Sequence, residues 1–303
     1  MKKRILSGMR PTGPMHLGHL VGALRNWVDL KDQYECFYMI ADWHALMSEY
    51  ESSKEIKANI INCVADWISC GVDPEKCNIF VQSDVPAHLE LSMTLSCLTP
   101  LSWLERCPTY KEQLREMKTR NLTTYAFLGY PVLQAADILV YKAGVVPVGV
   151  DQAAHLELTR EIARRFNSLY GKVFPEPETL LTSSPKLLGL DSRKMSKSYG
   201  NFIALSDSPK VILKKVKTMF TDPARMYRHD KGHPEKCNIC SYYKVFAPEK
   251  AKDVAEKCQN AGIGCADCKK ELAQILADML KPIQEKRNKL LKHKQEIFDI
   301  LER

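Results

Sequence analysis

The stretch RILSGMRPTGPMHLGH (residues 4–19) decides the fold. Its first part, Arg4–Gly8, is short and mostly apolar and ends in glycine, which predicts a strand entering a loop. From His16 onward, apolar residues recur every three or four positions and predict a helix. Unpaired N–H groups at the start of such a helix attract anions. A strand, a glycine-containing loop and a helix in this order therefore predict a phosphate-binding α/β fold.

The following segments continue the alternation of strands and helices. Apolar runs within Glu35–Trp43, Cys77–Gln82 and Gly144–Asp151 predict buried strands, and Lys54–Cys70 and His155–Tyr170 predict helices. This order is typical of a doubly wound parallel sheet. We predict a Rossmann-like α/β domain at residues 1–201, with a helical insertion at about 85–143 and a Ser/Lys-rich loop at 191–201, followed by an α-helical domain at 202–303.

Composition excludes several classes of protein. The chain has 303 residues, of which 45% are hydrophobic and 26% charged, so it can bury a sizeable core. No apolar run approaches the roughly 20 residues that cross a bilayer, and the apolar stretch after Met1-Lys-Lys-Arg4 is too short for a signal peptide. We therefore expect a cytoplasmic protein with no membrane partner. A net charge of +8 is compatible with a polyanionic partner.

Two short motifs carry the candidate chemistry. His16 and His19 lie three residues apart on one helical face, where they can hydrogen-bond a phosphate without placing a full positive charge there. Lys194-Met-Ser-Lys-Ser198 places two ammonium groups in a polar loop, which suits a departing pyrophosphate. Taken alone, each motif also fits ordinary surface or capping side chains.

Together the two motifs resemble the signatures of class I aminoacyl-tRNA synthetases. Further runs are similar to the bacterial-type tryptophanyl-tRNA synthetases, namely Ala41-Asp-Trp-His-Ala45, Gly129-Tyr-Pro-Val-Leu-Gln-Ala-Ala-Asp-Ile-Leu139, Val146-Pro-Val-Gly-Val-Asp-Gln152 and His155-Leu-Glu-Leu-Thr-Arg160. The resemblance implies activation of L-tryptophan with ATP and Mg²⁺ to an adenylate, transfer of the aminoacyl group to tRNA(Trp), and a homodimer.

The resemblance also implies which residues hold the nucleotide. The expected ATP contacts are Arg10, Pro11, Thr12, Gly18, His19, Gly149, Val150, Asp151, Leu187, Lys194, Met195, Ser196, Lys197 and Ser198. Asp151 would accept hydrogen bonds from the ribose hydroxyls, and Leu187 would contact adenine through its backbone. The expected catalytic groups, which stabilise the phosphates and the transition state, are His16, His19, Lys111, Lys194 and Lys197.

Asp137 is the candidate selector of the amino acid. An indole N–H is a lone donor, so a carboxylate in the apolar run Leu133–Leu139 is a fitting acceptor. Tyr130 and Gln134 precede it on the same helical face and would bind the α-amino group. The remaining substrate contacts that the resemblance implies are His44, Val146, Val148 and Gln152.

Two alternative functions stay open. Gln134 stands where the tryptophan enzymes often have Met, and the related tyrosyl-tRNA synthetases also use Gln and Asp after Tyr-Pro. The chain could therefore activate tyrosine. It could also be a synthetase-like binding protein without catalysis, although the two histidines and two lysines of the signatures are all present.

Five cysteines fall within 32 residues near the C-terminus, at positions 237, 240, 258, 265 and 268. Paired Cys-x-x-Cys motifs are typical of structural zinc sites. Some tryptophanyl-tRNA synthetases carry a 4Fe-4S cluster, and the spacing of Cys258, Cys265 and Cys268 resembles theirs. That resemblance implies a cluster held by Cys237, Cys258, Cys265 and Cys268. Cys240 is a rival for the first ligand, and zinc is the alternative metal.

Overall fold

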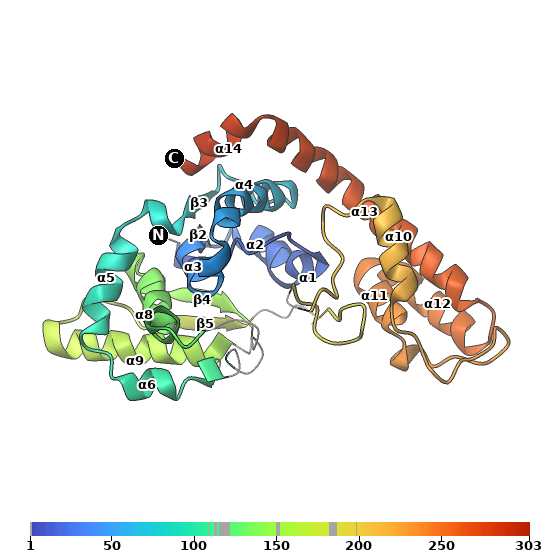
Figure 1. Cartoon of the computed structure of the whole chain (residues 1–303), viewed down its shortest axis with the longest axis horizontal. Coiled ribbons are helices and arrows are strands. Elements are labelled where there is room, and N and C mark those ends of the chain that lie inside the picture. Colours follow the sequence, from blue (N-terminus) through green and yellow to red (C-terminus); the bar gives the residue numbers. More distant parts are fainter. Residues whose placement is uncertain are drawn as a thin grey trace.

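A five-stranded parallel sheet forms the centre of the computed structural model, which describes residues 2–108, 110–111, 114, 122–149, 152–181, 187–197 and 199–303 (Figure 1). Its strands are β1 (Arg4–Met9), β2 (Glu35–Ile40), β3 (Cys77–Val81), β4 (Val145–Val148) and β5 (Glu178–Leu181). They pair in the order β3-β2-β1-β4-β5. The chain therefore winds outward from β1 in both directions, which confirms the predicted doubly wound α/β fold.

Helices pack around this sheet and continue beyond it. Those of the α/β region are α1 (Leu17–His19), α2 (Arg25–Leu30), α3 (Asp42–Glu49), α4 (Lys54–Ser69), α5 (Ala87–Ser96), α6 (Leu101–Glu105), α8 (Tyr125–Val140) and α9 (Ala153–Tyr170). The C-terminal ones are α10 (Pro209–Thr218), α11 (Asn238–Phe246), α12 (Pro248–Gln259), α13 (Cys265–Lys292) and α14 (Lys294–Leu301). No helix among the described residues is long and apolar enough to cross a bilayer.

Helix α8 brings the candidate substrate residues into the interior. Its N-cap Thr124 accepts a hydrogen bond from the Phe127 backbone N–H, which satisfies one of the free donors at the helix start. Most of its residues from Phe127 onward are buried, because α8 packs between α5 and α9. A helix that is apolar on nearly all sides belongs in a core. The polar side chains on α8 are therefore held in fixed positions.

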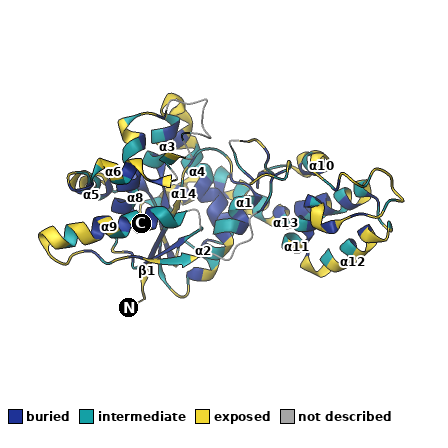
Figure 2. Ribbon diagram, turned by 90° about the horizontal axis from the view of Figure 1, so that it is seen from below, coloured by how far each residue is buried: buried dark blue, intermediate teal, exposed yellow. Residues whose placement is uncertain are grey.

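The long helix α13 crosses back from the C-terminal region and packs against α4 (Figure 1). Arg287 on α13, which is partly buried, forms an ion pair with the buried Asp66 on α4, with Nε 2.6 Å from Oδ1, and also donates to Asn62 Oδ1 at 2.8 Å. One hydrophobic cluster contains residues from β1 to α14, including Ile5 and Ile297. In Figure 2 the buried faces of α4, α1 and α13 lie close to one another. The α/β sheet and the C-terminal helices therefore share a core.

Candidate active site

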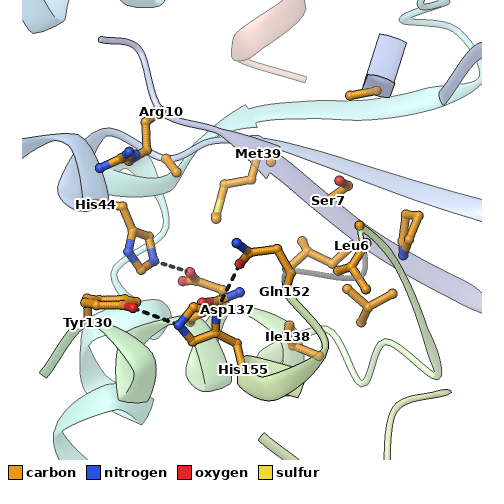
Figure 3. Close-up of a pocket in the computed structure, with 18 of the residues that line it drawn as sticks. Leu6, Ser7, Arg10, Met39, His44, Tyr130, Asp137, Ile138, Gln152 and His155 are labelled. Carbon is orange, nitrogen blue, oxygen red and sulfur yellow. Dashed lines mark hydrogen bonds and ion pairs between the residues drawn. The ribbon is translucent and has the colours of Figure 1, made fainter. Parts of the chain in front are cut away.

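A pocket of about 370 Å³ opens at the carboxyl end of the central strands. The ends of β1 and β2 provide one wall, α3 and α8 provide another, and the segment after β4 closes the third (Figure 3). Ligands of open α/β sheets bind at this edge, where the connections leave in opposite directions. The predicted residues that line the pocket are Arg10, His44, Tyr130, Gln134, Asp137, Val146, Val148, Gly149 and Gln152.

Asp137 is the buried carboxylate of this pocket, with 1% of its surface exposed. Its Oδ2 is 2.8 Å from His44 Nε2, and its Oδ1 is 2.7 Å from His88 Nδ1 and accepts from Gln82 Nε2 at 2.8 Å. Burial alone would raise the pKa of Asp137, but the hydrogen bonds to His44 and His88 outweigh burial and lower it. The side chain is therefore an ionised acceptor at the wall of a pocket that both polar and apolar residues line.

A second polar group lies beside Asp137 in the same pocket (Figure 3). The Tyr130 hydroxyl is 2.7 Å from His155 Nε2, and His155 Nδ1 is 3.0 Å from Gln152 Oε1. Tyr130 and His155 are both buried, and burial raises the pKa of the Tyr130 hydroxyl, so it stays protonated at neutral pH. Gln134 lines the same pocket one helical turn after Tyr130. These neutral groups can recognise a polar head group.

The rings of His16 and His19 lie against each other at the start of α1, with centroids 3.7 Å apart and planes tilted by 32°. Burial, reinforced by the positive charge of Lys197, lowers the pKa of His16 to about 3. Burial and the neighbouring His16 also lower the pKa of His19 well below its ordinary value. Both rings are therefore neutral at pH 7, which agrees with the expectation that they hydrogen-bond a phosphate without adding charge.

The loop around Lys194 and Lys197, here called the Lys/Ser loop, lies against the segment that contains His16 and His19, here called the histidine segment. Lys197 Nζ donates to the Gly13 carbonyl at 2.9 Å, and Met195 Sδ is 3.3 Å from the Gly18 backbone nitrogen. A Cβ on Gly18 would approach the His16 ring at 3.0 Å and Met195 at 3.4 Å, so glycine keeps the contact close. Burial lowers the pKa of Lys197. The structure thus brings the two motifs together, although Gly18 and Met195 are 177 residues apart in the sequence.

Several predicted nucleotide residues lie outside the walls of this pocket. Those at the histidine segment and the Lys/Ser loop are Pro11, Thr12, His16, Gly18, His19, Leu187, Lys194, Met195, Ser196 and Lys197. Met195 donates its backbone N–H to the Leu187 carbonyl at 3.2 Å, which ties the loop to the segment before it. Lys111 is exposed and does not line the pocket. Val150, Asp151 and Ser198 lie outside the described residues.

Three polar residues of the site were not predicted. Gln82, directly after β3, and His88, in the first turn of α5, are fully buried and hold Asp137, and His88 Nε2 also meets the Tyr141 hydroxyl at 2.9 Å. His155 belongs to a sequence run that carried the resemblance, but no role was assigned to it. A histidine and a glutamine in a segment otherwise expected to be apolar are the only sequence signal for such a network.

The five C-terminal cysteines lie near one another around α11, α12 and the start of α13. Burial, with the charges of Cys237, Cys258 and Cys265, raises the pKa of Cys268 to about 12. Arg225 approaches Cys258 Sγ with its Nη1 at 3.6 Å, and its buried Nε has no hydrogen-bond partner. Among the described residues, however, no three His, Cys, Asp or Glu side chains are arranged to hold one metal ion.

Comparison with known proteins assigns the chain to a family. The family model described as tRNA synthetases class I (W and Y) matches residues 1–281. The tryptophan–tRNA ligase of Thermotoga maritima is 52% identical, over 98% of this chain and 92% of the relative. That of Aquifex aeolicus is 42% identical, over 98% of this chain and 93% of the relative.

Solved structures give the same assignment. Tryptophanyl-tRNA synthetase from Campylobacter jejuni, complexed with ADP and tryptophan, superposes with a TM-score of 0.90 at 34% identity, covering 99% of this chain and 92% of that one. Tyrosyl-tRNA synthetase from Archaeoglobus fulgidus reaches a TM-score of 0.73 at 21% identity, over 94% of this chain and 90% of that one, and so shares the fold. On these matches, the chain belongs to the class I tRNA synthetase family that comprises the tryptophan and tyrosine enzymes.

Proposed function

We propose that this chain is a tryptophan–tRNA ligase. It activates L-tryptophan with ATP, forming tryptophanyl-adenylate and pyrophosphate, and then transfers the aminoacyl group to the 3′-terminal ribose of tRNA(Trp). The observation that carries this proposal is Asp137, a buried, ionised carboxylate, 1% exposed, at the wall of the pocket of a class I synthetase. An indole offers one N–H donor and no strong acceptor, so an acceptor-only side chain matches it.

Tryptophan is favoured over tyrosine by the similarity of the whole chain, whereas a phenol O–H could donate to Asp137 as an indole N–H does. Two curated tryptophan–tRNA ligases match nearly its full length at 52% and 42% identity. The test is ATP–pyrophosphate exchange with each amino acid, followed by aminoacylation of tRNA(Trp). Exchange driven by tryptophan and not by tyrosine supports the proposal. Exchange driven by tyrosine would overturn the substrate assignment, and no exchange with either would favour the non-catalytic alternative.

ATP is proposed to bind between the histidine segment and the Lys/Ser loop. His16 and His19 are neutral, and Lys197 lies beside them with its ammonium on the Gly13 carbonyl. Triphosphate oxygens can replace that carbonyl as acceptors for Lys197. In this proposal Leu187 presents its backbone to adenine, and Lys194 closes over the phosphates. Mg²⁺ enters with ATP and neutralises part of its charge.

The reaction needs no nucleophile from the protein. The tryptophan carboxylate attacks the α-phosphorus of ATP, the bond to the bridging oxygen breaks, and pyrophosphate leaves with the electron pair. Charge grows on the leaving group during this step, so catalysis rests on alignment and on cations placed before the reaction begins. We assign this stabilising role to Lys197 and Lys194, and phosphate positioning to His16 and His19. Lys111 is exposed and is proposed as a further phosphate ligand.

The C-terminal cysteines are proposed to hold a 4Fe-4S cluster through Cys237, Cys258, Cys265 and Cys268. Cysteine thiolates are the usual ligands of such clusters, and the unpaired buried Nε of Arg225 beside Cys258 would suit an anionic sulfur site. Since these thiols do not form a metal-holding group as placed, they must reorient when iron and sulfide bind. The cluster would supply structural cross-links and take no part in adenylation, which transfers no electrons.

Anaerobic purification with iron, sulfide and zinc analysis tests this proposal. About four iron and four sulfide per chain with absorbance in the blue would support it, whereas a colourless protein with stoichiometric zinc would favour the alternative. Exchanging Cys237 and Cys240 separately for serine identifies the first ligand. The Cys240 variant keeps the cluster if Cys237 is the ligand.

A homodimer is proposed through an exposed apolar surface beside the pocket. Helix α3 contributes Leu46, which is 42% exposed, and α5 contributes Leu89 and Met93, which are 45% and 65% exposed. A hollow of about 430 Å³ lies between α3, α5 and the start of α8. Contiguous apolar surface of this kind favours association. Light scattering of the wild type and of Leu89→Glu would give a dimer and a monomer respectively.

The remaining assignments follow from this function. We propose that residues 1–201 form the adenylation domain and residues 202–303 the anticodon-binding domain, in a cytoplasmic enzyme. The exposed Arg228 would contact tRNA phosphates beside the cysteines, because its side chain is 80% exposed. A decrease in the salt dependence of tRNA binding in Arg228→Gln would test this contact.

A further inference from the structure

One buried asparagine, Asn201, closes the Lys/Ser loop from the inside and is 5% exposed. Its Oδ1 accepts a hydrogen bond from the Ser196 backbone N–H at 2.9 Å. Its Nδ2 donates to the Lys194 carbonyl at 3.2 Å and to Asp191 Oδ1 at 2.7 Å. These contacts fix the loop backbone from Lys194 to Ser196, directly before Lys197.

The contacts of Asn201 require an amide in a narrow space. An amide accepts through its oxygen and donates through its NH₂ group, whereas a carboxylate only accepts. A Cβ on Gly189 would lie 2.3 Å from Asn201 Nδ2, so only glycine lets the amide come this close. The Gly189 N–H donates to the Arg193 carbonyl at 2.7 Å, and the Leu190 N–H donates to the Asn201 carbonyl at 2.8 Å. The base of the loop is therefore a tight turn that is packed around Asn201.

Helix α11 holds the same turn from the C-terminal side. Asn238, the first residue of α11, is 3% exposed and donates from Nδ2 to the Gly189 carbonyl at 2.7 Å. One turn later, the Tyr242 hydroxyl donates to the Leu188 carbonyl at 2.6 Å. Figure 1 shows the loop between α1 and α11, and on the α1 side Lys197 meets the histidine segment. The loop is therefore anchored to α11 at its base and contacts the ATP-binding segment with its lysine.

We propose that Asn201 and α11 form a clamp that positions Lys194 and Lys197 for the chemical step, which rests on the proposed function. Asn201 is the positioning residue, and Asn238 and Tyr242 anchor the turn that it closes. A flexible loop would lose conformational freedom each time its ammonium groups met the leaving pyrophosphate, and this loss would raise the barrier. A loop that is fixed beforehand avoids it, because cations stabilise a transition state best when they are already in place.

Three substitutions test the clamp. Asn201→Ala removes its three side-chain hydrogen bonds, and Asn201→Asp keeps an acceptor for Ser196 but places an oxygen against the Lys194 carbonyl and Asp191. Tyr242→Phe keeps the ring and removes one anchor. The assay is ATP–pyrophosphate exchange, with kcat and the KM values for tryptophan and ATP measured separately. Thermal unfolding of each variant reports whether it is folded.

Asn201→Ala and Asn201→Asp should each lower kcat for exchange by about 100-fold, the cost of displacing a catalytic group by about 1 Å. Tyr242→Phe should lower kcat by about fivefold, since one neutral hydrogen bond is lost. KM for tryptophan should stay unchanged, because neither Asn201 nor Tyr242 lines the pocket. A wild-type kcat in Asn201→Ala, or a rise in KM for tryptophan as large as the fall in kcat, would overturn the proposal.

Combination with Lys197→Met shows whether the clamp acts through the lysines. If it does, Asn201→Ala should cost clearly less than about 100-fold in the Lys197→Met background, because one of the cations that it positions is already absent. The same fold loss in both backgrounds would show that Asn201 acts on some other part of the enzyme, and would also overturn the proposal.

Asn167→Ala is the matched control. Asn167 closes the turn after α9 by the same chemistry, since its Oδ1 accepts from the N–H groups of Val173 and Phe174 at 2.9 and 3.0 Å and its Nδ2 donates to the Phe174 carbonyl at 2.8 Å. This variant should lose thermal stability but keep kcat, because its turn does not line the pocket or contact the Lys/Ser loop. A wild type that activates no tryptophan would reject the proposed function, whereas an active wild type with an equally active Asn201→Ala variant rejects this inference alone.

Discussion

Replacing Asp137 with asparagine should abolish the enzyme's selection for an indole N–H. Two donors, Gln82 Nε2 and His88 Nδ1, meet Oδ1 at 2.8 and 2.7 Å, so an asparagine would keep its carbonyl oxygen there. Its NH₂ group would then occupy the Oδ2 position beside His44. The opposite orientation would require Gln82, His88 and Tyr141 to reverse their hydrogen bonds together. An indole N–H would therefore meet a donor in place of an acceptor.

The expected magnitude follows from the nature of the lost contact. A hydrogen bond to a charged group contributes about 1.5–3 kcal/mol, or roughly 10- to 150-fold in kcat/KM. The assay is ATP–pyrophosphate exchange with L-tryptophan and with β-(benzothien-3-yl)-L-alanine, in which sulfur replaces the indole N–H. The wild type should prefer tryptophan by that factor, and Asp137→Asn should use both amino acids almost equally, with an unchanged KM for ATP.

Two results would refute this reasoning. A wild type that uses the sulfur analogue as well as tryptophan would show that Asp137 does not read the N–H group. An Asp137→Asn variant that keeps the full preference would show that another acceptor does so. Gln82 and His88 lose a charged partner when Asp137 is replaced, which could disrupt the hydrogen-bond network around this residue. Thermal unfolding of Asp137→Asn shows whether such a loss of structure, and not a lost contact to the substrate, explains the result.

Three further predictions concern other parts of the chain. Asp66→Asn should lower the free energy of unfolding in denaturant by about 3–5 kcal/mol, because it leaves Arg287 buried without a countercharge, whereas Asp66→Leu combined with Arg287→Met should cost less than Asp66→Asn alone. Burial lowers the pKa of His16 from 6.5 to about 3, so between these pH values the unfolded chain binds a proton at this residue and the folded chain does not. The free energy of unfolding should therefore fall as the pH drops from about 6.5 to about 3. It should fall less steeply in His16→Gln. Lys197→Met should reduce kcat for exchange by about two orders of magnitude or more with little change in KM for tryptophan, because one preorganised contact to the transition state is lost. A proportional rise in KM for tryptophan would argue against a role of Lys197 in the chemical step.

Much of the fold could be predicted because it depends on local patterns. The buried strands β1, β2 and β3 are continuous apolar runs, and α4 and α9 have the spacing of amphipathic helices. Strand β5 was missed, since its four residues are only partly buried or exposed and carry no apolar run. Helix α3 was also missed, because it follows β2 at once and shares its apolar character. Short elements of this kind take their structure from the neighbours that they pack against.

The residues of the site could be predicted where they belong to a recognisable sequence motif. Asp137, Tyr130 and Gln134 share a helical face, and the sequence shows that spacing directly. His88 and Gln82 lie some fifty residues from Asp137 and reach it only through the packing of α5 against α8. The spacing of residues along the sequence does not indicate a contact of this kind between distant segments. The same is true of Arg287 and Asp66, which are 221 residues apart.

The packing of α13 against α4 has a consequence for how the chain is made. Ribosomes release the N-terminal part first, so the face of α4 that carries Asp66 stays in contact with water until the segment with Arg287 has been synthesised. During that interval this face of α4 lacks the helix that later covers it. Chaperones that bind exposed apolar helices are therefore expected to engage the nascent chain at α4, and to leave it once α13 emerges.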